Sequence, residues 1–141
     1  MQSLTYASPH APRVLSLTRA VFGLAFMQHG AQKLFAVLGR EEAVTAFSQL
    51  WFAGVLEFFG GLLVAVGFFT RPVAFVLSGL MAWAYFQVHI GQAFFPIENG
   101  GELAMLFCWF FLFLAFAGGG SWSVDALLRR GGSAREGAGD A

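Results

Sequence analysis

The sequence predicts an all-α integral membrane protein, folded as a four-helix transmembrane bundle. Composition is the first observation, because 57% of the 141 residues are hydrophobic and 11% are charged, whereas soluble domains average about 45–50% and about 25%. The second is the positive mean hydropathy of +0.68. The third is that the apolar residues gather in four segments, each close to the roughly 20 residues that a helix needs to cross a bilayer.

Segment boundaries follow from where polar residues interrupt the apolar runs. The expected spans are residues 14–38, 51–69, 72–90 and 101–117, followed by a short amphipathic helix over 122–130, so that the membrane domain covers 14–130. A polar leader over 1–13 lacks the basic cluster of a signal peptide, so we expect the first span to be retained. Small and polar residues from 131 to 141 predict a disordered tail.

The connections carry their own signals. Residues 39–51 are too polar for hydrocarbon, and apolar residues at helical spacing from Ala43 predict an interfacial helix there. Pro72 suits the first turn of the third span, where a missing N–H costs nothing. Asn99 is expected to cap the fourth span, with Glu102 as its capping-box partner three residues later.

Basic residues predict the orientation, because cytoplasmic loops carry an excess of lysine and arginine. A cytoplasmic N-terminus leaves Arg40 outside and places five arginines inside: Arg13, Arg71, Arg129, Arg130 and Arg135. An even number of spans then puts the C-terminus in the cytoplasm as well. We therefore expect a multi-pass protein with both termini cytoplasmic.

This topology brings five ionisable residues into the outer half of the bundle: His29, Lys33, Glu57, His89 and Glu102. They are the candidate ligand-binding residues. One lysine or glutamate at the bilayer centre costs about 2.5–3.5 kcal/mol, so such groups need partners. We expect Lys33 to pair with Glu57 at a similar depth, with His29 beside them and His89 facing Glu102.

Four of these five residues also have a structural interpretation. The Lys33–Glu57 pair would then fix which helices meet, Glu102 would serve as a cap, and His89 would anchor the membrane interface. Positions expected to be structural are Gly30, Gly60, Gly61, Asn99 and Arg71, the glycines because small residues let helices approach closely. Arg19 is expected to stand alone on the inner side, where its side chain would snorkel to the interface.

Several classes of site and partner are disfavoured. The formal net charge of zero argues against nucleic-acid binding, and no metal site is expected. The single cysteine, Cys108, forms neither an internal disulfide nor a CxxC pair. Haem is disfavoured, because nothing fixes the separation of the two candidate ligands His29 and His89. No residue is assigned a catalytic role.

Four motifs in order, "HGAQKLF", "LEFFGGLLVAVGFFTRP", "NGGELA" and "GGGSWSVDALL", together resemble the DoxX family of small four-span bacterial membrane proteins, over about residues 15–130. The resemblance implies a bacterial inner (plasma) membrane and a redox setting, since the family is named for a component of a terminal quinol oxidase system. We therefore expect an accessory or subunit protein of a quinone-linked or oxidative-stress system, rather than an independent enzyme.

In that setting the ligand would be a quinone and the partners would be the lipid bilayer and a redox enzyme. Lys33 or His29 would donate a hydrogen bond to a quinone carbonyl, and Glu57 would accept a proton. A non-catalytic scaffold or assembly factor is the alternative. A small transporter is disfavoured, because four spans without a clear internal repeat are few for alternating access. Homo-oligomerisation stays open.

Overall fold

A computed structural model of the chain describes residues 8–139, with side chains from residue 8 to residue 131. Its elements are α1 (Ala11–Phe35), α2 (Gln49–Val66), α3 (Thr70–Ala84), the π-helix η1 (Tyr85–His89), α4 (Pro96–Asn99), α5 (Glu102–Ala117) and α6 (Val124–Gly139). The described residues contain no strand. The predicted all-α class is confirmed.

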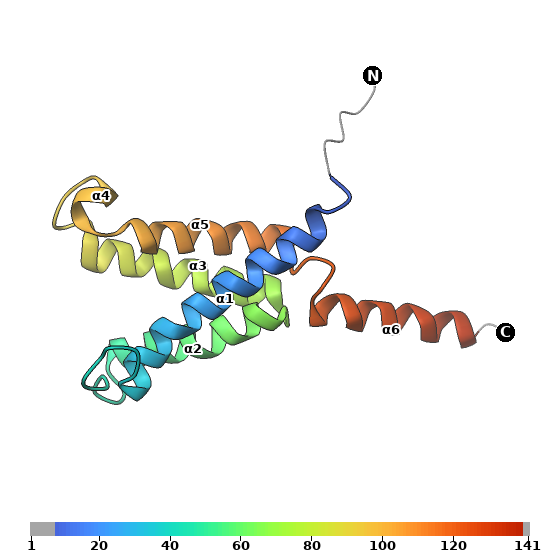
Figure 1. Ribbon diagram of the computed structural model, residues 1–141, viewed down its shortest axis with the longest axis horizontal. Coiled ribbons are helices and arrows are strands. Elements are labelled where there is room, and N and C mark those ends of the chain that lie inside the picture. The colour runs from blue at the N-terminus through green and yellow to red at the C-terminus, as the bar shows by residue number, and fades with distance from the viewer. Residues whose placement is uncertain (1–7, 140–141) are drawn as a thin grey trace, which may run out of the picture.

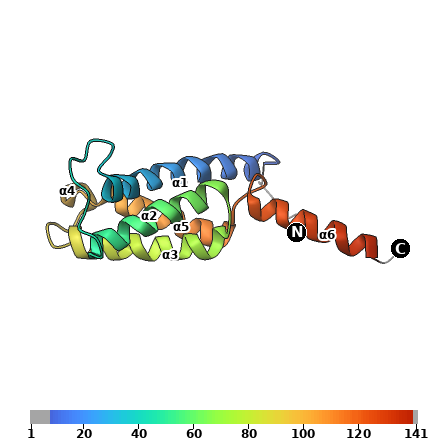
Figure 2. The same ribbon diagram turned by 90° about the horizontal axis from the view of Figure 1, so that it is seen from below.

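Four long helices lie alongside one another, with α1 packed on α2 and α3 packed on α5 (Figures 1 and 2). The α1–α2 loop and α4 lie at one end of this body, which we call the α4 end. The α2–α3 turn and the start of α6 lie at the opposite end, the α6 end. Helix α6 projects away from the other helices (Figure 2).

Glycines set the distance between α1 and α2. A Cβ atom on Gly30 would lie 2.6 Å from the carbonyl oxygen of Gly54, and one on Gly61 would lie 2.8 Å from that of Gly23. Real Cβ atoms do not approach backbone this closely, so only glycine permits the contact. On α2, Gly60 makes similar room for Leu77 of α3, whose Cδ2 would lie 2.7 Å from an added Cβ. The expected close-packing faces are present.

Aromatic and aliphatic side chains fill the space between the helices. Phe26 of α1 packs edge-on against Phe111 of α5, with ring centroids 4.8 Å apart, and Leu77 and Leu114 are buried beside them. The outward faces are apolar too: large exposed side chains include Val21, Leu24, Phe52, Phe59, Phe75, Trp109 and Phe116. Such extended apolar surfaces mark interaction with a membrane or a partner rather than with water.

Length and hydropathy identify α2 as the one helix, within the described residues, that qualifies by itself as a membrane span. Helix α5 is also apolar, but it is shorter, with 16 residues. Helix α1 is long enough, with 25 residues, but its polar residues lower its hydropathy. The four-span arrangement therefore stays a prediction.

The α1–α2 connection differs from expectation. Residues 36–48 form turns and bends, so the predicted interfacial helix is wrong. Leu38 and Phe47 adopt left-handed backbone conformations, with φ of +56° and +62°, which a right-handed helix cannot contain. Helix α2 then begins at Gln49, where the Ser48 hydroxyl accepts the Trp51 N–H at 3.2 Å.

Two other boundaries differ as well. The N-cap of α5 is Gly101, so the capping box predicted from Asn99 to Glu102 is wrong: Gly100, with φ of +68°, separates the two and ends α4 at Asn99. Helix α6 continues to Gly139, where a disordered tail was expected from residue 131. Four of the nine residues from 131 to 139 are glycine, so helix propensity does not explain the extension; residues 1–7 and 140–141 lie outside the described part.

Candidate functional site

Lys33 and Glu57 form an ion pair between α1 and α2. The lysine Nζ lies 2.5 Å from Oε2 of the glutamate, whose side chain is almost fully buried while that of Lys33 is 21% exposed. The close approach of the two helices places this pair, because a Cβ on Gly54 would lie 3.0 Å from the Cβ of Lys33. The pair expected from the sequence is therefore present.

A cavity of about 270 Å³ opens beside this ion pair. Its polar lining consists of His29, Lys33, Glu57 and His89, from α1, α2 and η1. Its apolar lining includes Phe26, Met81, Ala84, Leu103, Ala104 and Phe107. Four of the five candidate ligand-binding residues thus share one small amphipathic cavity.

The two histidines differ in what their ring nitrogens contact. No hydrogen bond from another described residue reaches His29, whose ring meets Phe107 edge-on with centroids 6.0 Å apart. His89 Nδ1 lies 3.0 Å from the carbonyl oxygen of Asn99. Since a carbonyl only accepts, Nδ1 carries the hydrogen, and Nε2 of the neutral ring is left as an acceptor.

His89 ends the π-helix η1, in which the Ile90 N–H bonds to the carbonyl of Tyr85 at 3.1 Å. This π-helix extends α3 and is followed by a turn at residues 90–92. Buried Asn99 holds the following loop, since its amide donates to the carbonyl of Ala93 at 2.9 Å and its Oδ1 accepts the Gly101 N–H at 2.8 Å. The structural role expected for Asn99 is therefore present in a different form: it braces the loop that follows His89.

Glu102 lies outside this group. It is exposed at the first residue of α5 and is not among the residues that line the cavity. The group that His89 contacts is the carbonyl of Asn99, so the expected His89–Glu102 pairing is wrong. The turn through Gly100 and Gly101 accounts for this, because it starts α5 later than the capping-box interpretation requires.

Arg19 is the centre of a second polar network, at the α6 end. Its side chain is 2% exposed. Its Nε donates to the carbonyl of Gly119 at 2.9 Å, and Nη2 donates to that of Trp122 at 2.8 Å. Its Nη1 donates to the carbonyls of Ala65, at 2.6 Å, and Val64. These last two belong to the final turn of α2, where the Val64 carbonyl also accepts the N–H of the C-cap residue Gly67 at 3.0 Å. The expected snorkelling of Arg19 is wrong.

Asp125, in the first turn of α6, caps the N-terminus of α3, a helix that comes much earlier in the sequence. Its two carboxylate oxygens accept the backbone N–H groups of Phe69 and Thr70, each at 2.9 Å, and its own N–H donates to the carbonyl of Gly67 at 2.9 Å. Burial acts to raise the pKa of Asp125, but the hydrogen bonds from Thr70 and Phe69 and the charge of Arg129 outweigh it and hold that pKa below its usual range.

Sequence reasoning missed this network because the partners of Arg19 are backbone carbonyls, which no residue type marks. One feature of the sequence points to this network: Arg19 lies on the same helix face as Gly23, where α1 meets α2. Across the described residues, no group of three His, Cys, Asp or Glu side chains is arranged to hold a metal ion.

Comparison with known proteins gives two matches. The sequence profile of the DoxX family matches residues 14–90. An uncharacterized protein of Haemophilus influenzae is 41% identical over 123 residues, which are 82% of this chain and 91% of the relative. No solved structure matches the chain.

Proposed function

Because the chain belongs to the DoxX family, we propose that it is a four-span protein of the bacterial inner membrane that binds a quinone headgroup in the cavity at the α4 end. The family's members are membrane proteins, and so is this chain. The four spans are α1, α2, α3 with η1, and α5. The arginine bias favours an orientation with the α6 end and both termini in the cytoplasm and the α4 end outside.

One observation carries the ligand proposal: a partly buried ion pair and two histidines with an uncommitted ring nitrogen line the same partly apolar cavity. A quinone headgroup is an apolar ring with carbonyl oxygens that need hydrogen-bond donors. Lys33 has N–H groups beyond the one that Glu57 accepts, and His29 can donate from its ring. Phe26 and Phe107 supply apolar walls.

The size of the cavity supports a single ring. Pockets for drug-sized ligands enclose about 300–1,000 Å³, so about 270 Å³ accommodates a headgroup and leaves an isoprenoid tail outside. The exposed apolar side chains of the long helices offer that tail a surface. A haem macrocycle is larger than this space, and Nδ1 of His89 is already bonded to Asn99.

We assign the protein an accessory role in a quinone-linked or oxidative-stress redox system. It would hold the quinone near a partner enzyme that carries out the electron transfer. The polar lining supports binding and orientation of the headgroup, and no redox step is assigned to the chain itself.

A scaffold function is the second candidate, and a specific observation favours it. Lys33 and Glu57 already satisfy one another at 2.5 Å, and glycine faces bring α1 and α2 together around them. In that case the ion pair specifies which helices meet, and the cavity is a by-product of the packing.

The test is extraction of small molecules from the purified protein, followed by mass spectrometric quantification of quinone per mole of chain. We expect near-stoichiometric quinone in the wild type and at least a tenfold loss in His29→Phe. The Lys33→Met/Glu57→Gln double variant, which removes both charges together, should lose quinone as well. His10→Phe is the control, because His10 is exposed, occupies the N-cap position of α1 and does not line the cavity.

Quinone at the level of an unrelated membrane protein would overturn the ligand proposal. Retention of quinone by both cavity variants would do the same. If quinone is absent and the double variant only lowers the unfolding temperature, the scaffold function stands in its place.

A further inference from the structure

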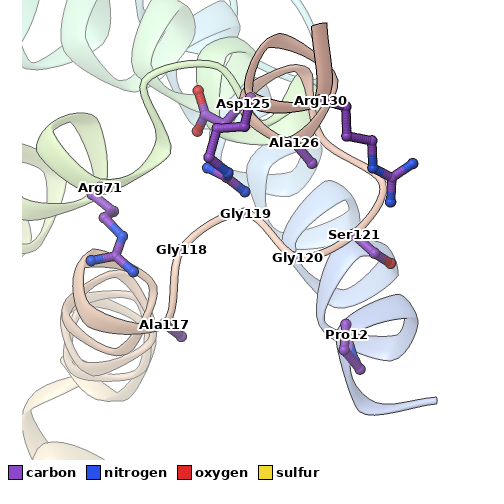
Figure 3. Close-up of a pocket in the computed structure, with 11 residues that line it drawn as sticks. Pro12, Arg71, Ala117, Gly118, Gly119, Gly120, Ser121, Asp125, Ala126 and Arg130 are labelled. Atoms are coloured by element: carbon purple, nitrogen blue, oxygen red, sulfur yellow. The ribbon is translucent and has the colours of Figure 1, made fainter. Parts of the chain in front are cut away.

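A second cavity lies at the α6 end, far along the helices from the first. It encloses about 690 Å³ and is built around the glycine loop between α5 and α6 (Figure 3). Lining residues come from that loop, from Pro12 at the start of α1, from Arg71 at the start of α3, and from α6 with Asp125, Arg129 and Arg130. The proposed quinone site uses none of these residues.

We propose that this cavity binds a phosphate-bearing anion, supplied by the headgroup of an anionic lipid in the leaflet at the α6 end. The proposal is independent of the quinone site. It rests on the charge of the lining, on the backbone donors of the loop and on the apolar surface beside the cavity.

The lining is strongly basic. Three guanidinium charges, from Arg71, Arg129 and Arg130, stand against the single carboxylate of Asp125, which leaves a net charge of +2. Both oxygens of that carboxylate already accept backbone N–H groups from the start of α3. Arginine suits this role, because its planar fork of N–H donors matches the oxygens of a phosphate group.

The arginines surround the loop rather than converge on one point. Arg71 lies on one side of Gly118–Gly120 and Arg130 on the other (Figure 3). A Cβ on Gly118 would lie 3.4 Å from Nε and 3.7 Å from Nη2 of Arg71, so that guanidinium lies against the loop. Both arginines are exposed, and no described residue pairs with either. Their donors are therefore available to a headgroup.

The glycine loop adds backbone N–H donors, and contacts with neighbouring residues fix the position of the loop. The N–H groups of Gly119 and Gly120 have no acceptor within the described residues, while the Gly119 carbonyl is fixed by Arg19 at 2.9 Å. Gly120 has φ of +78°, and a Cβ there would lie 2.6 Å from the carbonyl oxygen of Pro12. Successive unpaired N–H groups in such a turn form an anion-binding concavity.

The surroundings favour a lipid as the source of the phosphate. Trp122, Leu127 and Leu128 adjoin lining residues in the sequence and are exposed, the two leucines at 64% and 60%. Phe69, also exposed, lines a neighbouring cavity together with Leu128, Arg71 and Arg129. In the proposed orientation the first turns of α6 emerge from the membrane at this end, where apolar side chains beside arginines suit contact with lipid headgroups. A free phosphate would use the arginines but not this apolar surface.

The test measures the thermal unfolding of the full-length protein, delipidated in a neutral detergent, against added lipid. Phosphatidylglycerol should raise the unfolding temperature by several degrees more than phosphatidylcholine does, and raised salt should reduce the difference. In Arg71→Gln/Arg130→Gln the apparent affinity for phosphatidylglycerol should fall at least tenfold. Arg13→Gln, an exposed arginine outside the lining, should respond like the wild type.

Inorganic phosphate and glycerol phosphate form the second arm of this test. If either stabilises the wild type as much as phosphatidylglycerol, the source is a soluble phosphate, and the lipid part of the proposal fails. Equal stabilisation by the two lipids overturns the proposal. So does a double variant that responds like Arg13→Gln. None of these results depends on whether the protein retains quinone.

Discussion

Arg19 uses three side-chain nitrogens to hold carbonyl oxygens of α2 and of the loop that precedes α6. A hydrogen bond from a charged donor contributes about 1.5–3 kcal/mol, and a carbonyl that loses its partner while buried adds a penalty. The end of α2 and the glycine loop therefore depend on one side chain. A lysine ammonium cannot replace this planar fork.

Arg19→Met should accordingly lower the free energy of unfolding by about 3 kcal/mol or more. The matched control is Arg13→Met, two turns earlier on α1 and exposed, which should change stability little. Denaturant unfolding of both variants in the same detergent measures the difference. Equal stability of the two would show that the bonds of Arg19 contribute nothing.

Individual residues show how far the sequence could predict the site. The Lys33–Glu57 pair was predictable, because charged groups in an apolar helix need a partner and these two lie at matching depths. The place of Glu102 was not, because it depends on the backbone conformation of Gly100. Arg19 could not be assigned either, since backbone carbonyls as partners leave no mark in the sequence.

At the scale of elements, glycines bring α1 and α2 into backbone contact. A Cβ on Gly30 would lie 2.6 Å from the carbonyl oxygen of Gly54 and 2.8 Å from Cα of Phe58. Both are backbone atoms of a helix, so neither can move without shifting the whole helix. That contact also sets the separation of Lys33 and Glu57. In the sequence, Lys33 comes three residues after Gly30, and Glu57 comes three residues after Gly54.

Gly30→Ala should therefore destabilise the protein by about 1–3 kcal/mol through overpacking and should reduce quinone retention. Gly79→Ala is the control, because nothing lies within 4 Å of a Cβ at that helical position. Alanine is the better helix former by about 0.8–1.0 kcal/mol, so this variant should be neutral or more stable. Thermal unfolding of the pair checks the prediction, and a tolerated Gly30→Ala would contradict the close contact.

The helices themselves were predicted to within a few residues, because apolar runs bounded by polar or glycine-rich turns leave few choices. The connections were not. Apolar residues from Ala43 onward have helical spacing, but residues 36–48 form turns and bends, since the left-handed backbone at Phe47 interrupts the pattern. Helix α6 runs longer than expected, because composition alone does not distinguish a polar helix from a disordered tail.

At the scale of the whole molecule, the two polar networks lie at opposite ends of the same four helices. The α4 end holds the cavity with the ion pair and two histidines, and the α6 end holds the arginine-rich cavity. The proposed orientation puts the first toward the outside of the membrane and the second toward the cytoplasm. A headgroup of a different kind would then be bound at each end.

The three histidines of the chain provide the most direct test of the quinone site. His29 and His89 line the cavity at the α4 end, whereas His10 lies at the start of α1 at the α6 end. Nuclear magnetic resonance of the histidine ring nitrogens, recorded with and without a short-tailed quinone, should show shifts at His29 and His89 and none at His10. Unchanged His29 and His89 resonances, or equal shifts at all three, would contradict a quinone in this cavity.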